Sequence, residues 1–476
     1  MEDCCAGNGN NGGFDLVVIG AGSAGFSAAI TAADAGAKVA LVGHGTIGGT
    51  CVNVGCVPSK AMIRAVEIMH SARAAARFDG IDARAKITDW AAVVRQKQAL
   101  VDDLRAAKYS DVLPNYDAVT YIEGAARFQA DGSIKVDDQV IRAGKTIIAT
   151  GSRPHVPDID GLAGLDWLDS TSALELESLP DSMLIMGGGF IGVELAQIFA
   201  RAGSQVTIVT RRGLLPESEP EISADLTKHF ADEGIKVLDG LEYDHFERGD
   251  GQVTLQARRA GETLSISAER LLLATGRVPN SDSLALDIAG IKTDTGGGIV
   301  TDAHLQTSRA GVFATGDVTG RDQFVYMAAY GAKLAARNAM EGARLSYDNT
   351  VMPAVVFSDP QVASTGLTEA AARAKGHDVI TSVLPLEHVP RALAARDTRG
   401  LIKLVADKDS KRLLGAHILA PEGADSIQTA VLALKAGMTY DDLGHMIFPY
   451  LTNVEGLKLA AQTFEKNVSK LSCCAG

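Results

Sequence analysis

The 476-residue sequence lacks the features of a membrane or secreted protein. Its two long stretches without formal charge, residues 16–33 and 39–59, are each interrupted by glycines, so neither predicts a membrane-spanning helix. No basic segment precedes an apolar one near the N-terminus, so we expect no cleaved secretory signal. These absences favour a cytoplasmic protein without membrane insertion.

Positive charge is also scarce. The chain has 45 Lys and Arg against 58 Asp and Glu, a formal net charge of −13. An acidic surface repels the phosphate backbone of nucleic acids and anionic lipids. We therefore expect no nucleic-acid partner.

Cysteine is rare and clustered. The six cysteines form three sequence pairs: Cys4 and Cys5, Cys51 and Cys56, Cys473 and Cys474. This grouping differs from the spread disulfide framework of small secreted domains. Pairs in a reducing compartment indicate redox or metal chemistry instead.

Glycine, by contrast, is abundant: 50 residues, above the usual share of about 7%. An apolar strand at 14–19 leads into a glycine turn at 20–25 and an Ala-rich helix. The same plan returns at 183–192, where the second glycine turn begins 167 residues after the first. Each turn could be only a tight bend, but its place between strand and helix is that of a phosphate-binding turn. Two such units predict two doubly wound domains and two bound nucleotides.

Other segments complete the organisation. Strand-like segments end in Ala-Thr-Gly at 149–151, 274–276 and 314–316, where glycine permits a close approach of backbone to ligand. From about residue 350, short strands and then helices predict a third, α+β domain.

The segment GGTCVNVGCVPSK, residues 48–60, places two cysteines five residues apart. A helix starting near Pro58 would direct its N-terminal dipole at Cys56 and favour the thiolate. A zinc or iron–sulfur site needs about four ligands, which are not near in sequence, so a redox-active disulfide is the better interpretation.

This segment resembles the signature of the FAD-dependent pyridine nucleotide-disulfide oxidoreductases, and the glycine turns and Gly316-Asp317 extend the resemblance over nearly the whole chain. It implies an α/β fold with two Rossmann-like domains and a C-terminal α+β dimerisation domain. The implied cofactors are FAD and NADPH, and the implied assembly is a homodimer with active sites shared between subunits. The implied boundaries are a disordered leader at 1–12, an FAD domain at 13–150 and 276–349, an NADPH domain at 151–275 and a dimerisation domain at 350–476.

The resemblance also implies residue roles. Cys51 would be the distal thiol that exchanges with substrate, and Cys56 the proximal thiol in charge-transfer contact with the flavin. Lys60 would lie at the flavin, paired with Glu194, whose carboxylate would be costly if unpaired in its apolar helix. The remaining cofactor contacts would come from the turns, strand ends and nearby segments: Gly20, Gly22, Ser23, Ala24, Gly25, Gly49, Thr50, Ala149, Thr150, Gly151, Gly187, Gly189, Gly192, Arg211, Arg212, Gly276, Arg277, Gly316 and Asp317.

Two departures concern the nucleotides. The acid that usually holds the adenosine ribose, about 20 residues after the first turn, is replaced by Gly43 beside His44. The second unit also lacks this acid and has Arg211 and Arg212, which favours a 2′-phosphate and hence NADPH over NADH.

A third departure concerns the substrate. Family members that reduce organic disulfides carry a His-Pro before a glutamate as the base, whereas this chain has Tyr450 five residues before Glu455. Adjacent Cα atoms such as those of Cys473 and Cys474 lie about 3.8 Å apart, below the 4.4 Å or more that a relaxed disulfide prefers, so this pair suits a soft metal ion. Together these features resemble the branch of the family that reduces mercuric ion, in which Tyr109 and Tyr450 would line the metal site.

The expected reaction is NADPH-dependent reduction of Hg(II) to Hg(0). The metal ligands would be Cys51, Cys56, Cys473 and Cys474, with Hg(II) arriving as a thiol complex. A disulfide reductase of a small thiol compound and a non-catalytic metal-sequestering flavoprotein are the alternatives. Cys4 and Cys5 could scavenge metal or be incidental, and the N-terminal metallochaperone-like domain of many such enzymes is missing.

Overall fold

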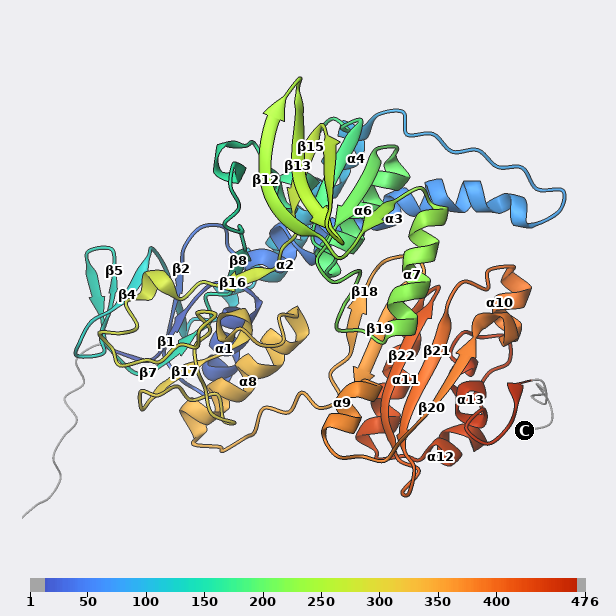
Figure 1. Ribbon diagram of the computed structural model, residues 1–476. Coiled ribbons are helices and arrows are strands. Elements are labelled where there is room, and N and C mark those ends of the chain that lie inside the picture. The colour runs from blue at the N-terminus through green and yellow to red at the C-terminus, as the bar shows by residue number, and fades with distance from the viewer. Residues whose placement is uncertain (1–12, 469–476) are drawn as a thin grey trace, which may run out of the picture. The chain divides into compact units, whose positions relative to one another are not determined.

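A computed structural model describes residues 13–468 (Figure 1). The chain divides into two compact units. Within the described range, the first unit contains residues 13–58, 98–153 and 277–348, and the second contains 59–97, 154–276 and 349–468. Each unit therefore collects segments that lie far apart in the sequence.

The first unit is built on a five-stranded parallel sheet with the order β17-β7-β1-β2-β3. Its helices α1 and α8 pack against one face, and a small three-stranded sheet, β4-β5-β6, belongs to the cluster on the other. A parallel sheet covered on both faces requires apolar strands, and β1 and β2 are almost entirely buried. The bounds are β1 Phe14–Ile19, α1 Ser23–Asp34, β2 Val39–Gly43, β3 Val119–Glu123, β4 Ala126–Phe128, β5 Ile134–Val136, β6 Gln139–Ile141, β7 Ala143–Ile148, β17 Val312–Ala314 and α8 Val325–Glu341.

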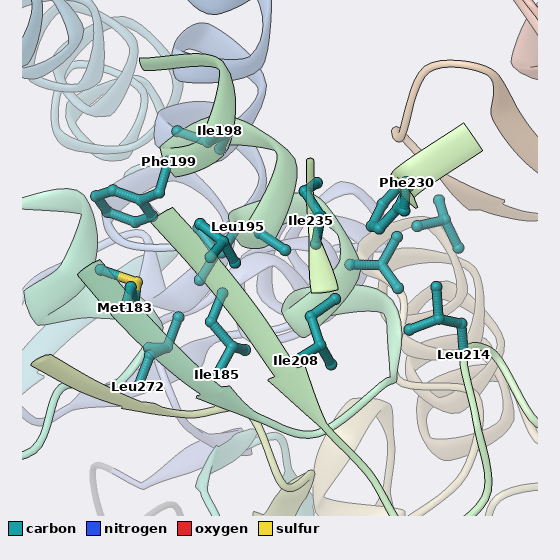
Figure 2. Packing of buried hydrophobic residues seen from close by; sticks show 14 of the residues in the cluster. Met183, Ile185, Leu195, Ile198, Phe199, Ile208, Leu214, Phe230, Ile235 and Leu272 are labelled. Atoms are coloured by element: carbon teal, nitrogen blue, oxygen red, sulfur yellow. The ribbon is translucent and has the colours of Figure 1, made fainter. Parts of the chain in front are cut away.

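The second unit begins with a four-stranded parallel sheet, β11-β10-β9-β15. Figure 2 shows how Met183 and Ile185 of β9 and Ile208 of β10 pack with Leu195 and Phe199 of α6. An antiparallel sheet, β12-β13-β14, packs with the same strands in a separate apolar cluster. The bounds are β9 Ser182–Met186, α6 Phe190–Ala202, β10 Gln205–Val209, α7 Pro220–Asp232, β11 Lys236–Leu238, β12 Glu242–Gly249, β13 Gln252–Arg259, β14 Glu262–Ala268 and β15 Arg270–Leu273.

The C-terminal part of this unit is an antiparallel sheet, β18-β19-β22-β21-β20, packed against helices α11 to α13. It forms the α+β arrangement that the sequence predicts after residue 350, so the predicted fold class is confirmed. The bounds are β18 Ala354–Val356, β19 Gln361–Gly366, β20 Val379–Pro385, β21 Leu401–Asp407, β22 Leu413–Ala420, α11 Gly423–Lys435, α12 Tyr440–His445 and α13 Glu455–Gln462.

The remaining helices and strands connect these layers. They are α2 Gly49–Asn53, α3 Cys56–Ala74, α4 Trp90–Arg105, β8 Ser152–Pro154, α5 Ser170–Leu174, β16 Arg277–Pro279, α9 Glu369–Ala374 and α10 Pro390–Ala395. Across residues 13–468, none of the helices has the length and apolar character needed to span a bilayer.

A buried charge cluster ties α7 to the C-terminal sheet. The Lys403 ammonium on β21 donates to Glu219 at 2.9 Å, to Glu221 at 2.9 Å and to Glu369 at 3.1 Å. Lys403 and Glu219 are each only 2% exposed in their side chains. Although burial lowers it, hydrogen bonds to the three glutamates raise the pKa of Lys403 above its usual range. One lysine thus pairs with carboxylates from two segments of the unit, the start of α7 and the short helix that begins at Glu369.

Replacing Lys403 with Met should therefore destabilise the second unit by about 3–5 kcal/mol, because Glu219 would remain buried without its cation. Lys408→Met is the matched control, since Lys408 forms an exposed ion pair with Asp378, with both side chains 61% exposed. We expect thermal unfolding to begin roughly 5–10 °C lower in Lys403→Met and to be nearly unchanged in the control. Equal melting temperatures would show that the cluster contributes little.

Candidate functional site

The first glycine turn is held against the end of a neighbouring strand. The Gly20 N–H donates to the Val42 carbonyl at 2.7 Å, and Gly20 has φ +116°. A Cβ on Gly20 would lie 2.2 Å from the Ala149 carbonyl oxygen, and one on Gly25 would lie 1.7 Å from the Gly20 oxygen. Only glycine fits either position.

The second turn repeats this geometry. The Gly187 N–H donates to the Val209 carbonyl at 2.9 Å, with φ +122°. A Cβ on Gly187 would lie 2.2 Å from the Ala274 oxygen, and one on Gly192 would lie 2.1 Å from the Gly187 oxygen. The Ala-Thr-Gly segments at 149–151 and 274–276 therefore form the walls against which the two turns pack.

Each turn leads into a helix whose N-terminus is open to an anion. Gly22 and Gly189 are the N-caps of α1 and α6, and no described side chain caps either helix. Neither helix has an acidic residue in its first turn, and a Cβ on Gly189 would meet only open space. Unfilled backbone N–H groups and the positive end of the helix dipole are what a pyrophosphate needs. The residues present thus fit two dinucleotide cofactors.

Asp317 lies in a polar cluster at the end of β17. The Ser152 hydroxyl donates to Asp317 at 2.7 Å, and Arg277 donates to the Ser152 hydroxyl at 2.8 Å and to its carbonyl at 2.6 Å. Beside them, the Thr150 hydroxyl donates to the Asn280 carbonyl at 2.7 Å. The structure brings Thr150, Arg277 and Asp317 into one place. Ser152 and Asn280 were not predicted, because no motif marks them.

The two central cysteines lie at helix ends. Cys51 is within α2, and α3 begins at Cys56, two residues before the predicted start near Pro58. Both side chains are half-buried. The N-terminal dipole of α3 stabilises negative charge at Cys56 and so favours its thiolate.

Tyr109 lies close to this pair. It belongs to a single π-helical turn, Ala106–Ser110, and its hydroxyl is 2.9 Å from the Ser23 hydroxyl. Burial raises the pKa of Tyr109, the hydrogen bond with Ser23 opposes this, and charge on Cys51 or Cys56 raises it further. The hydroxyl therefore stays neutral and within electrostatic reach of both thiols.

A second tyrosine near Cys56 was missed by the sequence analysis. Burial raises the pKa of Tyr326 above its usual range, and the charges of Cys56 and Asp322 raise it further. Tyr326 lies in the first turn of α8, and its ring stacks on Phe324 with centroids 5.4 Å apart. No spacing pattern links residue 326 to residue 56, so only the folded chain shows this proximity.

The predicted ion pair of Lys60 and Glu194 is present in the second unit. The Lys60 ammonium donates to Glu194 at 2.6 Å and lies 4.8 Å from the centre of the Phe357 ring. The other carboxylate oxygen of Glu194 accepts the Phe357 N–H at 2.9 Å. Both oxygens of a nearly buried carboxylate are thereby satisfied. The role of the pair beside the flavin remains a prediction.

Arg211 and Arg212 follow β10, beyond the second turn. The Arg211 guanidinium lies 5.2 Å from the centre of the Tyr243 ring, and Arg212 donates to Glu217 at 2.8 Å. Both arginines are exposed. The strand end is thus basic and open to solvent, as a 2′-phosphate requires.

The residues expected from the C-terminal part are only partly described. Tyr450 is 55% exposed in the loop before α13, whereas Glu455 is buried and accepts the Leu451 N–H at 3.3 Å. Cys473 and Cys474 lie outside the described residues, as do Cys4 and Cys5. Within residues 13–468, no group of three or more His, Cys, Asp or Glu side chains could hold a metal ion.

Known proteins match this chain over nearly its whole length. Residues 14–339 match the pyridine nucleotide-disulphide oxidoreductase family, and residues 352–461 match its dimerisation domain. The mercuric reductase of Streptomyces lividans is 46% identical over 98% of this chain and 99% of its own length. That of Bacillus cereus is 45% identical over 97% of this chain and 73% of its own.

A solved structure has the same fold. The Cu(II) complex of the HOCl-induced flavoprotein disulfide reductase RclA from Escherichia coli superposes with a TM-score of 0.84. It is 31% identical and covers 95% of this chain and 99% of its own. Together with the paired glycine turns and the cysteine segment between α2 and α3, these matches show that the chain belongs to the pyridine nucleotide-disulphide oxidoreductase family.

Proposed function

We propose that the protein is an NADPH- and FAD-dependent reductase of mercuric ion, which converts NADPH and Hg(II) into NADP⁺, a proton and Hg(0). The observation that carries this proposal is the cysteine pair with Tyr109 beside it, in a chain that has Tyr450 where disulfide reductases have a histidine base. The identity of 44–46% to several mercuric reductases supports the same conclusion.

The chain supplies two nucleotide sites of equal design. The open N-termini of α1 and α6 would hold the pyrophosphates of FAD and NADPH, and Asp317 with Ser152 and Arg277 would form the polar wall of the first site. When bound, FAD would supply the redox chemistry that links NADPH oxidation to the cysteine pair.

Three features of the chain prepare the cysteine pair for a soft metal. The helix dipole of α3 favours the Cys56 thiolate, and Cys51 exchanges with the incoming metal complex. Tyr109 stays protonated, so it adds no negative charge beside the two thiols. The ion pair with Glu194 fixes the Lys60 ammonium on α3.

Metal delivery is assigned to the C-terminal tail, residues 469–476, which carries Cys473 and Cys474. Small thiols bind Hg(II) strongly, so the ion arrives as a thiol complex and must be extracted by protein thiolates. The partner subunit's Cys473 and the partner subunit's Cys474 would form the extracting pair in a homodimer assembled through the C-terminal dimerisation domain. Hg(II) then passes to Cys51 and Cys56 by thiolate exchange.

The direct test is NADPH oxidation by the FAD-loaded protein with excess small thiol present. Mercuric ion should support many turnovers, whereas glutathione disulfide and lipoamide should support little. Faster turnover with either disulfide would favour the disulfide-reductase alternative, and binding of mercuric ion without turnover would favour sequestration.

Arg211→Ala with Arg212→Ala should raise the KM for NADPH by roughly 10- to 100-fold, because charge-assisted bonds to the 2′-phosphate would be lost. The KM for NADH, which lacks this phosphate, should change little. Arg258→Ala is the control, since Arg258 pairs with Asp244 at 3.0 Å on the neighbouring sheet. Steady-state kinetics with both nucleotides make the comparison, and equal effects on the two would contradict the assignment.

Cys473→Ala with Cys474→Ala should abolish turnover of thiol-bound mercuric ion but spare NADPH-dependent reduction of an artificial electron acceptor. Heterodimers that join a tail-mutant chain to a Cys51→Ala, Cys56→Ala chain should retain roughly half of the sites. Each chain must first be shown to bind FAD. Inactive heterodimers would leave transfer within one chain as the only route.

A further inference from the structure

Gly43, the last residue of β2, occupies the position at which dinucleotide-binding folds place the ribose-binding acid. It is buried, and it is not among the glycines with φ in the left-handed region. Its backbone conformation is therefore available to any residue. The reason for a glycine at residue 43 must therefore lie in its surroundings and not in its backbone conformation.

The space beside Gly43 is filled by Tyr121 of the neighbouring strand β3. A Cβ on Gly43 would lie 2.5 Å from the Tyr121 hydroxyl oxygen and 2.8 Å from the ring atom Cε2. It would also lie 2.8 Å from the Cβ of Ala21, in the first glycine turn. Real Cβ contacts are not this short, so no side chain fits at residue 43 while Tyr121 and Ala21 keep their places.

The position of Tyr121 is fixed by the sheet. β3 pairs with β2 in parallel register, with Tyr121 opposite Leu41 and Glu123 opposite Gly43. The ring is half-buried and packs against the apolar cluster that includes α1, as Ala21 does. The hydroxyl thus reaches the end of β2, beside the turn that leads into the first pyrophosphate site.

The Tyr121 hydroxyl is available to form a hydrogen bond with a ligand. No hydrogen bond joins it to another residue in the described part of the chain. Burial raises the pKa of Tyr121, and the charge of Glu123 raises it further, so the hydroxyl remains a neutral donor. A ribose hydroxyl can accept from such a donor.

We propose that the Tyr121 hydroxyl takes the place of the missing acid and hydrogen-bonds the adenosine ribose of FAD, with Gly43 providing the room. The inference rests on the proposed FAD binding. Tyr121 is a positioning residue for the cofactor and does not take part in the reduction. Glu123, which is exposed at the same strand end, is the rival candidate that the experiment must separate.

The test measures the Kd of FAD for the apoprotein. The change in flavin fluorescence on binding reports the bound fraction. Tyr121→Phe should raise the Kd about 3- to 10-fold, the loss expected for one hydrogen bond. Tyr116→Phe, the same change at another half-buried tyrosine of this unit, should leave the Kd unchanged, as should Glu123→Gln. A wild-type Kd in Tyr121→Phe, or a weaker Kd in Glu123→Gln alone, would overturn the inference. Failure of the wild type to bind FAD would instead refute the proposed function.

FAD analogues can show which ribose hydroxyl the Tyr121 hydroxyl contacts. FAD analogues that lack the 2′- or 3′-hydroxyl of the adenosine ribose should bind the wild type more weakly than FAD does. With Tyr121→Phe, one of the two deletions should cost nothing further, because the bond is already lost. Additive losses for both analogues would overturn the assignment to the ribose.

An exchange of residues tests the shared space. Gly43→Glu alone should weaken FAD binding, because the new side chain collides with Tyr121. Gly43→Glu combined with Tyr121→Val and Ala21→Gly should bind FAD more tightly than Tyr121→Val with Ala21→Gly does, because both colliding groups are then removed and the acid occupies the vacated place. A triple variant no better than its matched double variant would show that residues 43 and 121 do not form one subsite.

Discussion

The close approach of each glycine turn to a strand end is the constraint on which both nucleotide sites depend. Gly20 lies against Ala149 and Gly187 against Ala274, with almost the same contact and the same backbone conformation. A single methyl group at either glycine would force the turn away from the strand. The helix that follows would then no longer aim its N-terminal N–H groups at the pyrophosphate. The same backbone atoms therefore set both the position of each helix N-terminus and the electrostatic attraction that it offers to a pyrophosphate.

The sequence alone predicts the two glycine turns and their helices, because the constraint that shapes them is local. A strand, a glycine turn and a helix lie within about 20 residues, so the pattern and its repeat after 167 residues suffice to predict two such units. The pairing of Lys60 with Glu194 was also predictable, since a carboxylate in an apolar helix requires a cation and the family resemblance supplies one. The confirmed fold class follows from the same local patterns.

Contacts between distant segments could not be predicted in this way. Tyr326 comes within reach of Cys56, and Ser152 joins Arg277 to Asp317, only when the folded chain brings segments far apart in sequence together. Gly43 shows the limit most clearly. Its departure from the usual acid is visible in the sequence, but the group that fills the space comes from β3, some 80 residues later, by a register that no local pattern sets.

The choice of metal follows from what surrounds the cysteine pair. Within residues 13–468, Cys51 and Cys56 are not joined by a third His, Cys, Asp or Glu in a metal-binding group. Zinc and similar ions prefer about four ligands, whereas Hg(II) is stable between two thiolates. Tyr109, whose pKa is raised, contributes a neutral hydroxyl rather than a further anionic ligand. In the proposed function, two thiolates with a protonated tyrosine beside them suit a soft ion that accepts low coordination, and the Hg(0) formed by reduction leaves because it has little affinity for thiolate.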